Sequence, residues 1–341
     1  MSPGGPLRLG TRGSTLARRQ SELVADALRR SGREVELITV VTQGDVHPPD
    51  TAWGEGAFVG ALESALLAGT VDLAVHSAKD VPIDAGARRG GPSAGRHGPT
   101  AAGTDDGMQA PARVDHGATA ASEGLVIAAY LSREDPRDAL VAREGIMAGG
   151  AVSVDGLPAG ARVGTDSPRR GAFLRAWRPD LRIVPLHGNV DTRLRHLDAG
   201  DVDALVLAVA GLVRLGHADR AGCPLDPGRV PPAPAQGALA VQCRSNDVAL
   251  REVLTTLDDA TTRRCVEAER EVLRATGGGC RAPLGALATP DGERVDLLAG
   301  AIVADGRPVI LRRAAGKADA LDLARELGRS LLEAGFRGVL A

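Results

Sequence analysis

The sequence predicts an α/β protein with two similar lobes, each built on a parallel sheet, followed by a smaller α+β domain. Three observations support this fold class. Strand, turn and helix patterns alternate along most of the chain, the pattern that opens the chain returns near residue 160, and the C-terminal part changes to a hairpin between two helices. The 341 residues are enough for two or three domains with sizeable cores.

The first lobe is predicted to begin with a strand, a turn and a helix over residues 7–30, LRLGTRGSTLARRQSELVADALRR. Alternating leucines suit the strand, apolar residues then recur at helical spacing, and Ser14 is a candidate N-cap for the helix. Residues 33–45 predict a second strand. Residues 56–82 predict a helix, a short apolar strand at 71–75 and a polar loop.

Residues 84–124 interrupt this pattern. They are rich in glycine, alanine and proline and have no apolar period. We therefore predict a disordered insertion, after which ordered structure resumes at residue 125.

The second lobe repeats the opening pattern in ARVGTDSPRRGAFLRAW, residues 161–177. Ser167 as N-cap and Pro168 at the first helical position are a strong signal for a helix start. Residues 181–200 and 202–216 predict two further strand–helix pairs. The helices of both lobes are thus expected to direct their N-termini toward one place.

The C-terminal part predicts a different class of domain. Residues 260–279 indicate a helix, residues 294–314 a hairpin about Asp305-Gly306, and residues 319–335 a second helix. The apolar face of that second helix is predicted to consist of Leu321, Ala324, Leu327 and Leu331. This small domain carries Cys280 on a loop.

Composition excludes several classes of function. The net charge of -2 does not indicate an overall basic surface of the kind that binds nucleic acid. With 2% aromatic residues, we do not expect aromatic side chains on which nucleic-acid bases stack. We find neither an apolar leader nor a long apolar run, so we expect a soluble cytoplasmic protein that does not bind membranes. The four cysteines lack C-x-x-C spacing, and neither a metal site nor a disulfide framework is expected.

Cys280 is unusual for a structural thiol. It follows Gly277, Gly278 and Gly279 and precedes Arg281 in RATGGGCRAP. Glycines let the backbone approach another body closely, and a neighbouring arginine favours the reactive thiolate. Cys243 and Cys265, in contrast, lie in apolar contexts and are predicted to fill the core.

Basic side chains gather where strands end and helices start, namely Arg12, Arg169, Arg170, Arg193 and Arg214. Helix N-termini and guanidinium groups together suit carboxylates or phosphates, although surface arginines can also simply be solvated. The only lysines in the sequence are Lys79 and Lys317. Lys79 lies in VHSAKDVP beside Asp80, whose carboxylate is either a general base or cation stabiliser, or part of an ordinary turn. Residues 42–58 are either an active-site lid or an ordinary loop.

Several segments together resemble the porphobilinogen deaminase family. They are HSAKDVP, REDPRDAL, VGTDSPRR, HGNVDTRL, LAVAGLVRLG, PAPAQGALAVQCR and GGGCRAPLGA, and the resemblance runs from Leu7 to about Leu340 except for the insertion. It implies two lobes like those of periplasmic binding proteins, with a parallel-rich sheet each, and a C-terminal α+β domain. The expected boundaries are 1–134 with 233–254 for the first lobe, 135–232 for the second and 255–341 for the C-terminal domain.

The resemblance also implies a reaction. Four porphobilinogen molecules would be joined head to tail with loss of ammonia, giving linear hydroxymethylbilane in haem biosynthesis. The family carries a dipyrromethane cofactor, attached by a thioether that would fall on Cys280. The family enzyme is expected to act as a monomer.

Residue roles follow from the same resemblance. Asp80 would protonate the leaving amine and stabilise cationic intermediates, with Lys79 beside it. The cofactor would be held by Arg12, Ser14, Ser77, Lys79, Thr165, Ser167, Arg169 and Arg170, and the substrate by Arg12, Arg170, Arg193, Arg214, His187 and Gln20.

Four positions depart from the family pattern. Glu55 and Gly60 stand where loop lysines are often found, His187 replaces an arginine, and Asp166 adds a negative charge where small residues are common. These departures and the insertion motivate an alternative, a divergent paralogue that binds a pyrrole or polycarboxylate without completing the tetrapyrrole. A two-lobed binding protein without covalent chemistry is a further alternative, but it would need neither Cys280 nor Asp80.

Overall fold

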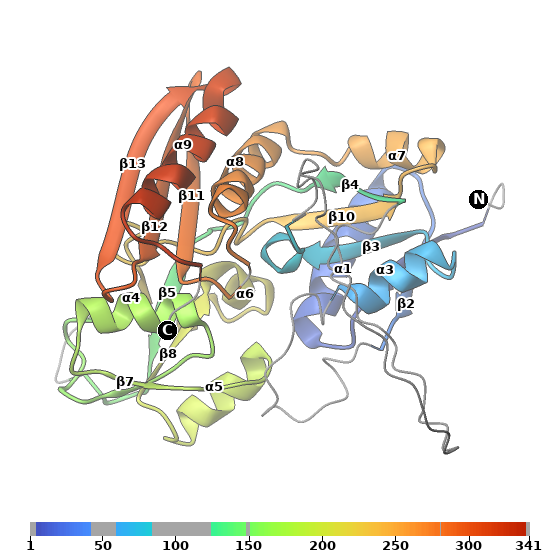
Figure 1. Ribbon diagram of the computed structural model, residues 1–341. Helices are drawn as coiled ribbons and strands as arrows, with labels where there is room; N and C mark the ends of the chain where they lie inside the picture. The colour runs from blue at the N-terminus through green and yellow to red at the C-terminus, as the bar shows by residue number, and fades with distance from the viewer. Residues whose placement is uncertain (1–4, 42–58, 84–123, 148–150, 280, 339–341) are drawn as a thin grey trace, which may run out of the picture.

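The computed structural model describes residues 5–41, 59–83, 124–147, 151–279 and 281–338. Within them the chain forms three bodies, two α/β lobes and a C-terminal domain packed against both (Figure 1). The predicted fold class is confirmed. No helix among the described residues is long and apolar enough to cross a membrane.

The first lobe is built on a five-stranded sheet. In spatial order the strands are β2 (Val35–Thr39), β1 (Leu7–Thr11), β3 (Leu73–Ser77), β10 (Leu239–Arg244) and β4 (Leu125–Tyr130). Strand β1 pairs with β2 and β3 in parallel, whereas β10 runs antiparallel to β3 and β4. The helices of this lobe are α1 (Thr15–Arg30), α3 (Gly60–Leu67) and α7 (Val248–Thr255), and the 3-10 turn η1 (Ala78–Asp80) follows β3.

The second lobe repeats this plan. Its sheet has the order β7 (Arg182–Val184), β6 (Arg162–Gly164), β8 (Ala204–Ala208), β5 (Asp138–Ala142) and β9 (Cys223–Pro224), with β5 antiparallel to both neighbours. Its helices are α4 (Pro168–Trp177), α5 (Val190–Asp198) and α6 (Val209–Arg214), and η2 (Ala218–Arg220) precedes β9. Among the described residues, each lobe therefore has four strands in one direction and one reversed strand.

The C-terminal domain is an antiparallel sheet covered by two helices. The strands are β11 (Leu284–Asp291), β12 (Arg294–Ile302) and β13 (Pro308–Gly316), and the helical elements are α8 (Ala260–Thr276), η3 (Lys317–Asp319) and α9 (Ala320–Glu333). The predicted hairpin is confirmed, while β11 is an additional strand. Strand β11 approaches the segment between β9 and β10 so closely that a Cβ on Gly285 would lie 2.3 Å from the Pro231 carbonyl oxygen.

Helix starts follow the predicted capping chemistry. The Ser14 hydroxyl accepts a hydrogen bond from the Ala17 amide at 3.3 Å, and the Ser167 hydroxyl accepts one from the Arg170 amide at 3.4 Å. Because β1 and β6 run in parallel within their own sheets, both caps lie at the carboxyl edges of those sheets. Open α/β folds bind ligands at this edge.

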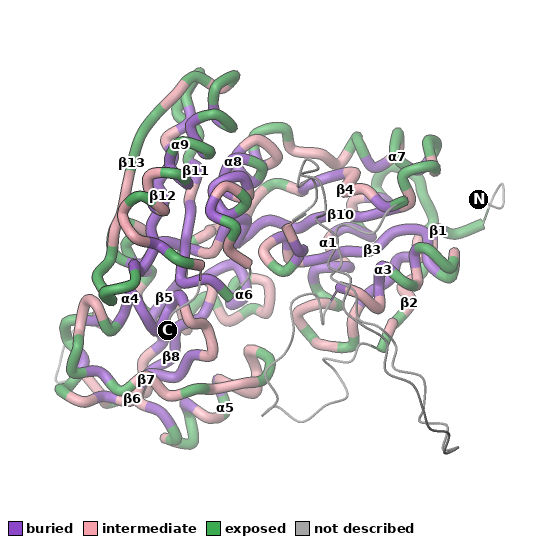
Figure 2. Tube along the Cα trace, viewed as in Figure 1, coloured by how far each residue is buried: buried purple, intermediate pink, exposed green. Residues whose placement is uncertain are grey.

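Each body has its own buried core, seen as continuous purple strands in Figure 2. Cys243 and Cys265 are buried in these cores, as predicted. Burial raises the pKa of both thiols to about 11, so neither forms a thiolate readily near neutral pH. The two are structural residues.

Two local predictions need correction. The strand predicted at 71–75 runs over Leu73–Ser77, because the remote strand β10 pairs with His76 and Ser77. On α9, Leu321 is exposed and Leu323 is buried instead. The buried positions Ala320, Leu323, Ala324, Leu327 and Leu331 follow the helical period, and Leu321 lies off that face.

Candidate functional site

The carboxyl edge of the first sheet presents the residues that follow β1 and β3. Asp80 is exposed at the end of η1, and the Lys79 side chain next to it is half-buried. The Gln20 amide, on α1, lies 3.0 Å from the Ser77 hydroxyl, so these two predicted ligand-binding residues contact each other. Arg12 follows β1 at the same edge and is half-buried.

The edge of the second sheet holds a buried ion cluster. Arg169 Nη2 donates to Asp138 Oδ2 at 2.8 Å, and Arg170 donates to Asp138 Oδ1 through Nη2 at 2.6 Å and Nε at 3.0 Å. All three side chains are buried. Burial acts to raise the pKa of Asp138, but the charges of Arg169 and Arg170 outweigh it and hold that pKa well below its usual range.

Asp138 was not identified by sequence reasoning, and it changes how the two arginines function. Both guanidinium groups are already oriented by one carboxylate, so they enter the site with fixed directions. Two positive charges against one negative leave a net positive charge at this edge. A carboxylate ligand would therefore bind beside two guanidinium groups whose orientation is already fixed.

Three further predicted residues lie on the second lobe. Arg193 Nε donates to the Gly188 carbonyl at 2.9 Å, and Arg214 Nη2 donates to the Gly237 carbonyl at 2.6 Å. Burial lowers the pKa of each arginine to about 10, so both stay protonated near neutral pH. His187 Nδ1 lies 3.1 Å from Asp166 Oδ2, so two of the four residues that depart from the family pattern contact each other.

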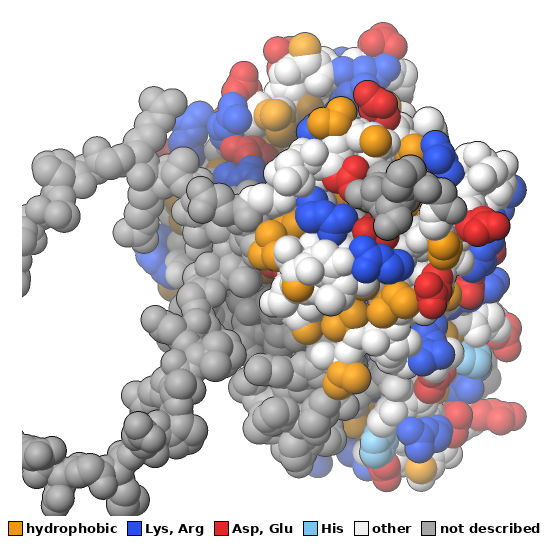
Figure 3. Space-filling model, turned by 90° about the vertical axis from the view of Figure 1, so that its right-hand side faces the viewer, with side chains coloured by type: hydrophobic (Ala, Val, Ile, Leu, Met, Phe, Trp, Pro, Cys, Tyr) orange, Lys and Arg blue, Asp and Glu red, His pale blue; other side chains and the backbone are white. Residues whose placement is uncertain are grey.

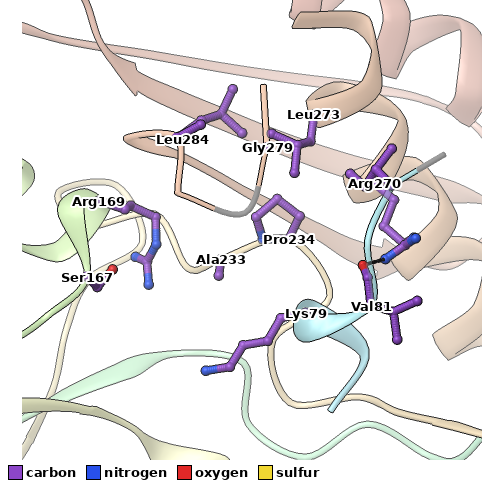
Figure 4. A pocket seen from close by; sticks show the side chains of 12 residues that line it. Lys79, Val81, Ser167, Arg169, Ala233, Pro234, Arg270, Leu273, Gly279 and Leu284 are labelled. Carbon is purple, nitrogen blue, oxygen red and sulfur yellow. Dashed lines mark hydrogen bonds between the residues drawn. The ribbon is translucent and has the colours of Figure 1, made fainter. Parts of the chain in front are cut away.

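A pocket brings the three bodies together (Figure 4). Lys79 enters it from the first lobe and Arg169 from the second, and Gly279 of the C-terminal domain lies above them. Ser167 and Arg270 also line this pocket. Burial, followed by the nearby charge of Arg170, lowers the pKa of Lys79 to about 8.

Parts of the predicted site lie outside the described residues. These are Cys280, Glu55 and the rest of the loop 42–58, and the insertion 84–124 apart from Gly124. The pocket nevertheless includes Gly279, the residue before Cys280. In the part of the chain that the structure describes, no group of histidine, cysteine and acidic residues could hold a metal ion.

Two family models match the chain. One, described as porphobilinogen deaminase, dipyromethane cofactor binding domain, matches residues 7–89 and 118–252. The other, described as porphobilinogen deaminase, C-terminal domain, matches residues 263–334. The unmatched residues 90–117 lie within the predicted insertion.

Curated relatives match over nearly the whole chain. A porphobilinogen deaminase of Nocardia farcinica is 45% identical over 348 residues, covering 99% of this chain and 88% of the relative. One of Acidothermus cellulolyticus is 43% identical, covering 96% and 89%. One of Mycobacterium tuberculosis is 42% identical, covering 98% of each.

Solved structures give a weaker likeness. An ABC transporter periplasmic substrate-binding protein from Coxiella burnetii is similar with a TM-score of 0.40 at 16% identity, covering 75% of this chain and 94% of that one. A TM-score this low supports no conclusion of its own.

Proposed function

The chain belongs to the porphobilinogen deaminase family, and from this premise we propose which residues attach the cofactor, transfer the proton and bind the substrate. The protein is a transferase, a hydroxymethylbilane synthase that joins four porphobilinogen molecules head to tail and releases ammonia. The product is linear hydroxymethylbilane, a precursor in haem biosynthesis. The alternative of a divergent paralogue gains no support from the matches.

One observation carries the assignment of roles: Lys79, Arg169 and Gly279 line a single pocket although they come from three different bodies. Each pyrrole of the substrate and of the cofactor carries two carboxylates. The cationic side chains of this pocket are chemically suited to such a polyanion. The same holds for the net positive charge of the Asp138 cluster, which consists of Asp138, Arg169 and Arg170.

The protein uses a dipyrromethane cofactor, and we assign its attachment to Cys280. Gly279 supports this choice, because it is the residue before Cys280 in the sequence and it lines the same pocket as the cationic side chains of Lys79 and Arg169. Lys79, Arg169, Arg170 and Arg12 would hold its carboxylates, with hydroxyl donors from Ser14, Ser77, Thr165 and Ser167. When attached, the cofactor supplies the anchored end of the growing pyrrole chain.

We assign the proton transfer to Asp80. In the substrate the pyrrole nitrogen supplies an electron pair, the carbon–nitrogen bond of the aminomethyl group breaks, and ammonia leaves with the proton that the Asp80 carboxyl delivers. The resulting carboxylate then stabilises the positive charge on the pyrrole. Exposure of Asp80 at the end of η1 leaves it accessible to substrate.

The remaining predicted residues are assigned to the incoming substrate. Arg193 and Arg214 stay charged near neutral pH and each is anchored to a backbone carbonyl, so both would present a fixed cation to a carboxylate. His187, the residue before Gly188, would add an imidazole, and Gln20 supports Ser77 from α1.

Partner and location assignments also stay proposals. We propose a monomer in the cytoplasm, with porphobilinogen as its small-molecule substrate and without nucleic-acid or membrane partners. Basic and acidic side chains are interspersed on the face shown in Figure 3, which suits a protein without a polyanionic partner on that face. The predicted domain boundaries likewise stay predictions.

Exchange of Asp80 tests the assignment of roles. Asp80→Asn should lower kcat by about 10²- to 10⁴-fold with little change in KM, because an amide cannot deliver the proton. Asp80→Glu, which keeps the carboxyl, should recover part of the loss. If Asp80→Asn turns over like the wild type, the proton-transfer role is wrong.

A further inference from the structure

Gln236 lies in the crossover that returns from the second lobe to the first, between β9 and β10, and is fully buried. Its backbone is held by charged side chains from different bodies. Arg133 Nε donates to the Gln236 carbonyl at 2.8 Å, Arg214 donates to the Gly237 carbonyl at 2.6 Å, and the Ala235 amide donates to Glu269 Oε2 at 2.6 Å. The Gln236 backbone is therefore well fixed.

The direction of the Gln236 amide is set by its neighbours. Nε2 donates to the Pro136 carbonyl at 2.8 Å and to Asp138 Oδ1 at 2.9 Å. Both partners can only accept hydrogen bonds, so the amide nitrogen must face them. Oε1 consequently faces the opposite side, where it accepts a hydrogen bond from Lys79 Nζ at 3.1 Å and lies 3.5 Å from Arg170 Nη2.

We propose that Gln236 is a positioning residue, which holds the Lys79 ammonium at the pocket and couples it to the Asp138 cluster across the boundary between the lobes. Lysine has a long flexible side chain with several accessible rotamers. The buried amide restricts it to one position. The inference rests on the proposed role of Lys79 in binding carboxylates.

The charges around Lys79 make its protonation sensitive to this contact. Asp80 lies on the same element, Arg169 and Arg170 face it from α4, Asp138 faces it from β5, and Arg270 on α8 lines the same pocket. Burial and Arg170 lower the pKa of Lys79 to about 8. Loss of the Gln236 acceptor would favour the neutral amine further.

The sequence allows a direct test, because Lys79 and Lys317 are the only lysines. Protein labelled with ¹³C at the lysine Cε should give two lysine signals by NMR, which Lys317→Arg assigns. Lys317 pairs with Glu293 at 2.7 Å away from the pocket and is an internal reference. In the wild type the Lys79 signal should titrate with a midpoint near 8.

Gln236→Met keeps the side-chain length but removes the acceptor, and it should lower the Lys79 midpoint by about one pH unit. Gln242→Met is the matched control. Gln242 is an equally buried glutamine bonded to His76 and Glu63 and should leave the Lys79 midpoint unchanged. Gln236→Asn, which draws the amide back by one methylene, tests the same shift if the methionine variant does not fold.

The outcomes separate the two claims. An unchanged Lys79 midpoint in the folded Gln236 variants would overturn the positioning role, and so would an equal shift in Gln242→Met. A shifted midpoint together with a raised KM for porphobilinogen supports it. If Lys79→Met loads its cofactor and turns over like the wild type, the proposed role of Lys79 fails while the measured coupling to Gln236 stands.

Discussion

Asp138 is predicted to be the main electrostatic support of the second-lobe edge, and Asp138→Asn is the perturbation that tests it. The carboxylate is buried and pairs with Arg169 at 2.8 Å and with Arg170 at 2.6 Å. Removing one partner of a buried ion pair destabilises a protein by about 3–5 kcal/mol, because an uncompensated charge remains. Here two guanidinium groups would lose their shared partner.

The expected loss of stability in Asp138→Asn is large relative to a folding free energy of about 5–15 kcal/mol. We expect the thermal midpoint of Asp138→Asn to fall by roughly 6–20 °C. Asp198→Asn is the control, since its pair with Arg220 is largely exposed and should contribute about 0–1 kcal/mol. Circular dichroism melts of the three proteins measure the difference.

The pH dependence of this effect has a defined sign. The pKa of Asp138 in the folded protein lies well below its ordinary value, so its ionised form stabilises the folded state above about pH 4. That contribution is lost as the pH falls through the folded-state pKa. The difference in thermal midpoint between the wild type and Asp138→Asn should therefore be largest near pH 7 and decrease below about pH 4. If Asp138→Asn lowers the thermal midpoint at pH 7 no more than Asp198→Asn does, Asp138 is not the main electrostatic support of this edge.

Two further predictions concern the other charged contacts. His187→Arg should lower the KM for porphobilinogen, because a guanidinium can bind a carboxylate through two parallel hydrogen bonds whereas an imidazole offers one donor at a time; an unchanged KM would contradict this. Glu269→Gln should destabilise the protein by about 3–5 kcal/mol, since this buried carboxylate accepts from Arg133 at 2.6 Å and from the Ala235 and Ala288 amides. If calorimetry gives Glu269→Gln the same thermal midpoint as the wild type, Glu269 does not stabilise the fold in this way.

The elements that carry local signals could be predicted from the sequence. Ser14 and Ser167 have the capping chemistry of helix starts, and the structure places both as caps. The repeated strand–turn–helix pattern places the ends of β1 and β6 at the carboxyl edges of their sheets, so the location of the cationic residues also follows from local sequence. These signals lie within a few residues of each other.

The contacts that organise the site are remote in sequence and could not be predicted. Asp138 contacts Arg169 and Arg170, which follow it by 31 and 32 residues, and Gln236 contacts Lys79 across 157 residues. The roles of Asp138 and Gln236 also depend on their burial, and the presence of a polar residue in a motif does not show whether that residue is buried. One usable signal was missed: Asp138 opens the apolar run DALVA, where a carboxylate needs a partner once it is buried.

We propose that the dipyrromethane cofactor is attached through Cys280, and the intact mass of the purified protein shows whether it is. We expect an excess mass equal to that of a dipyrromethane in the wild type and none in Cys280→Ser. It should persist in Cys223→Ser, which removes a thiol that is not buried. An excess mass that persists in Cys280→Ser, or a wild-type chain still unmodified after incubation with porphobilinogen, would show that the cofactor is not attached through Cys280.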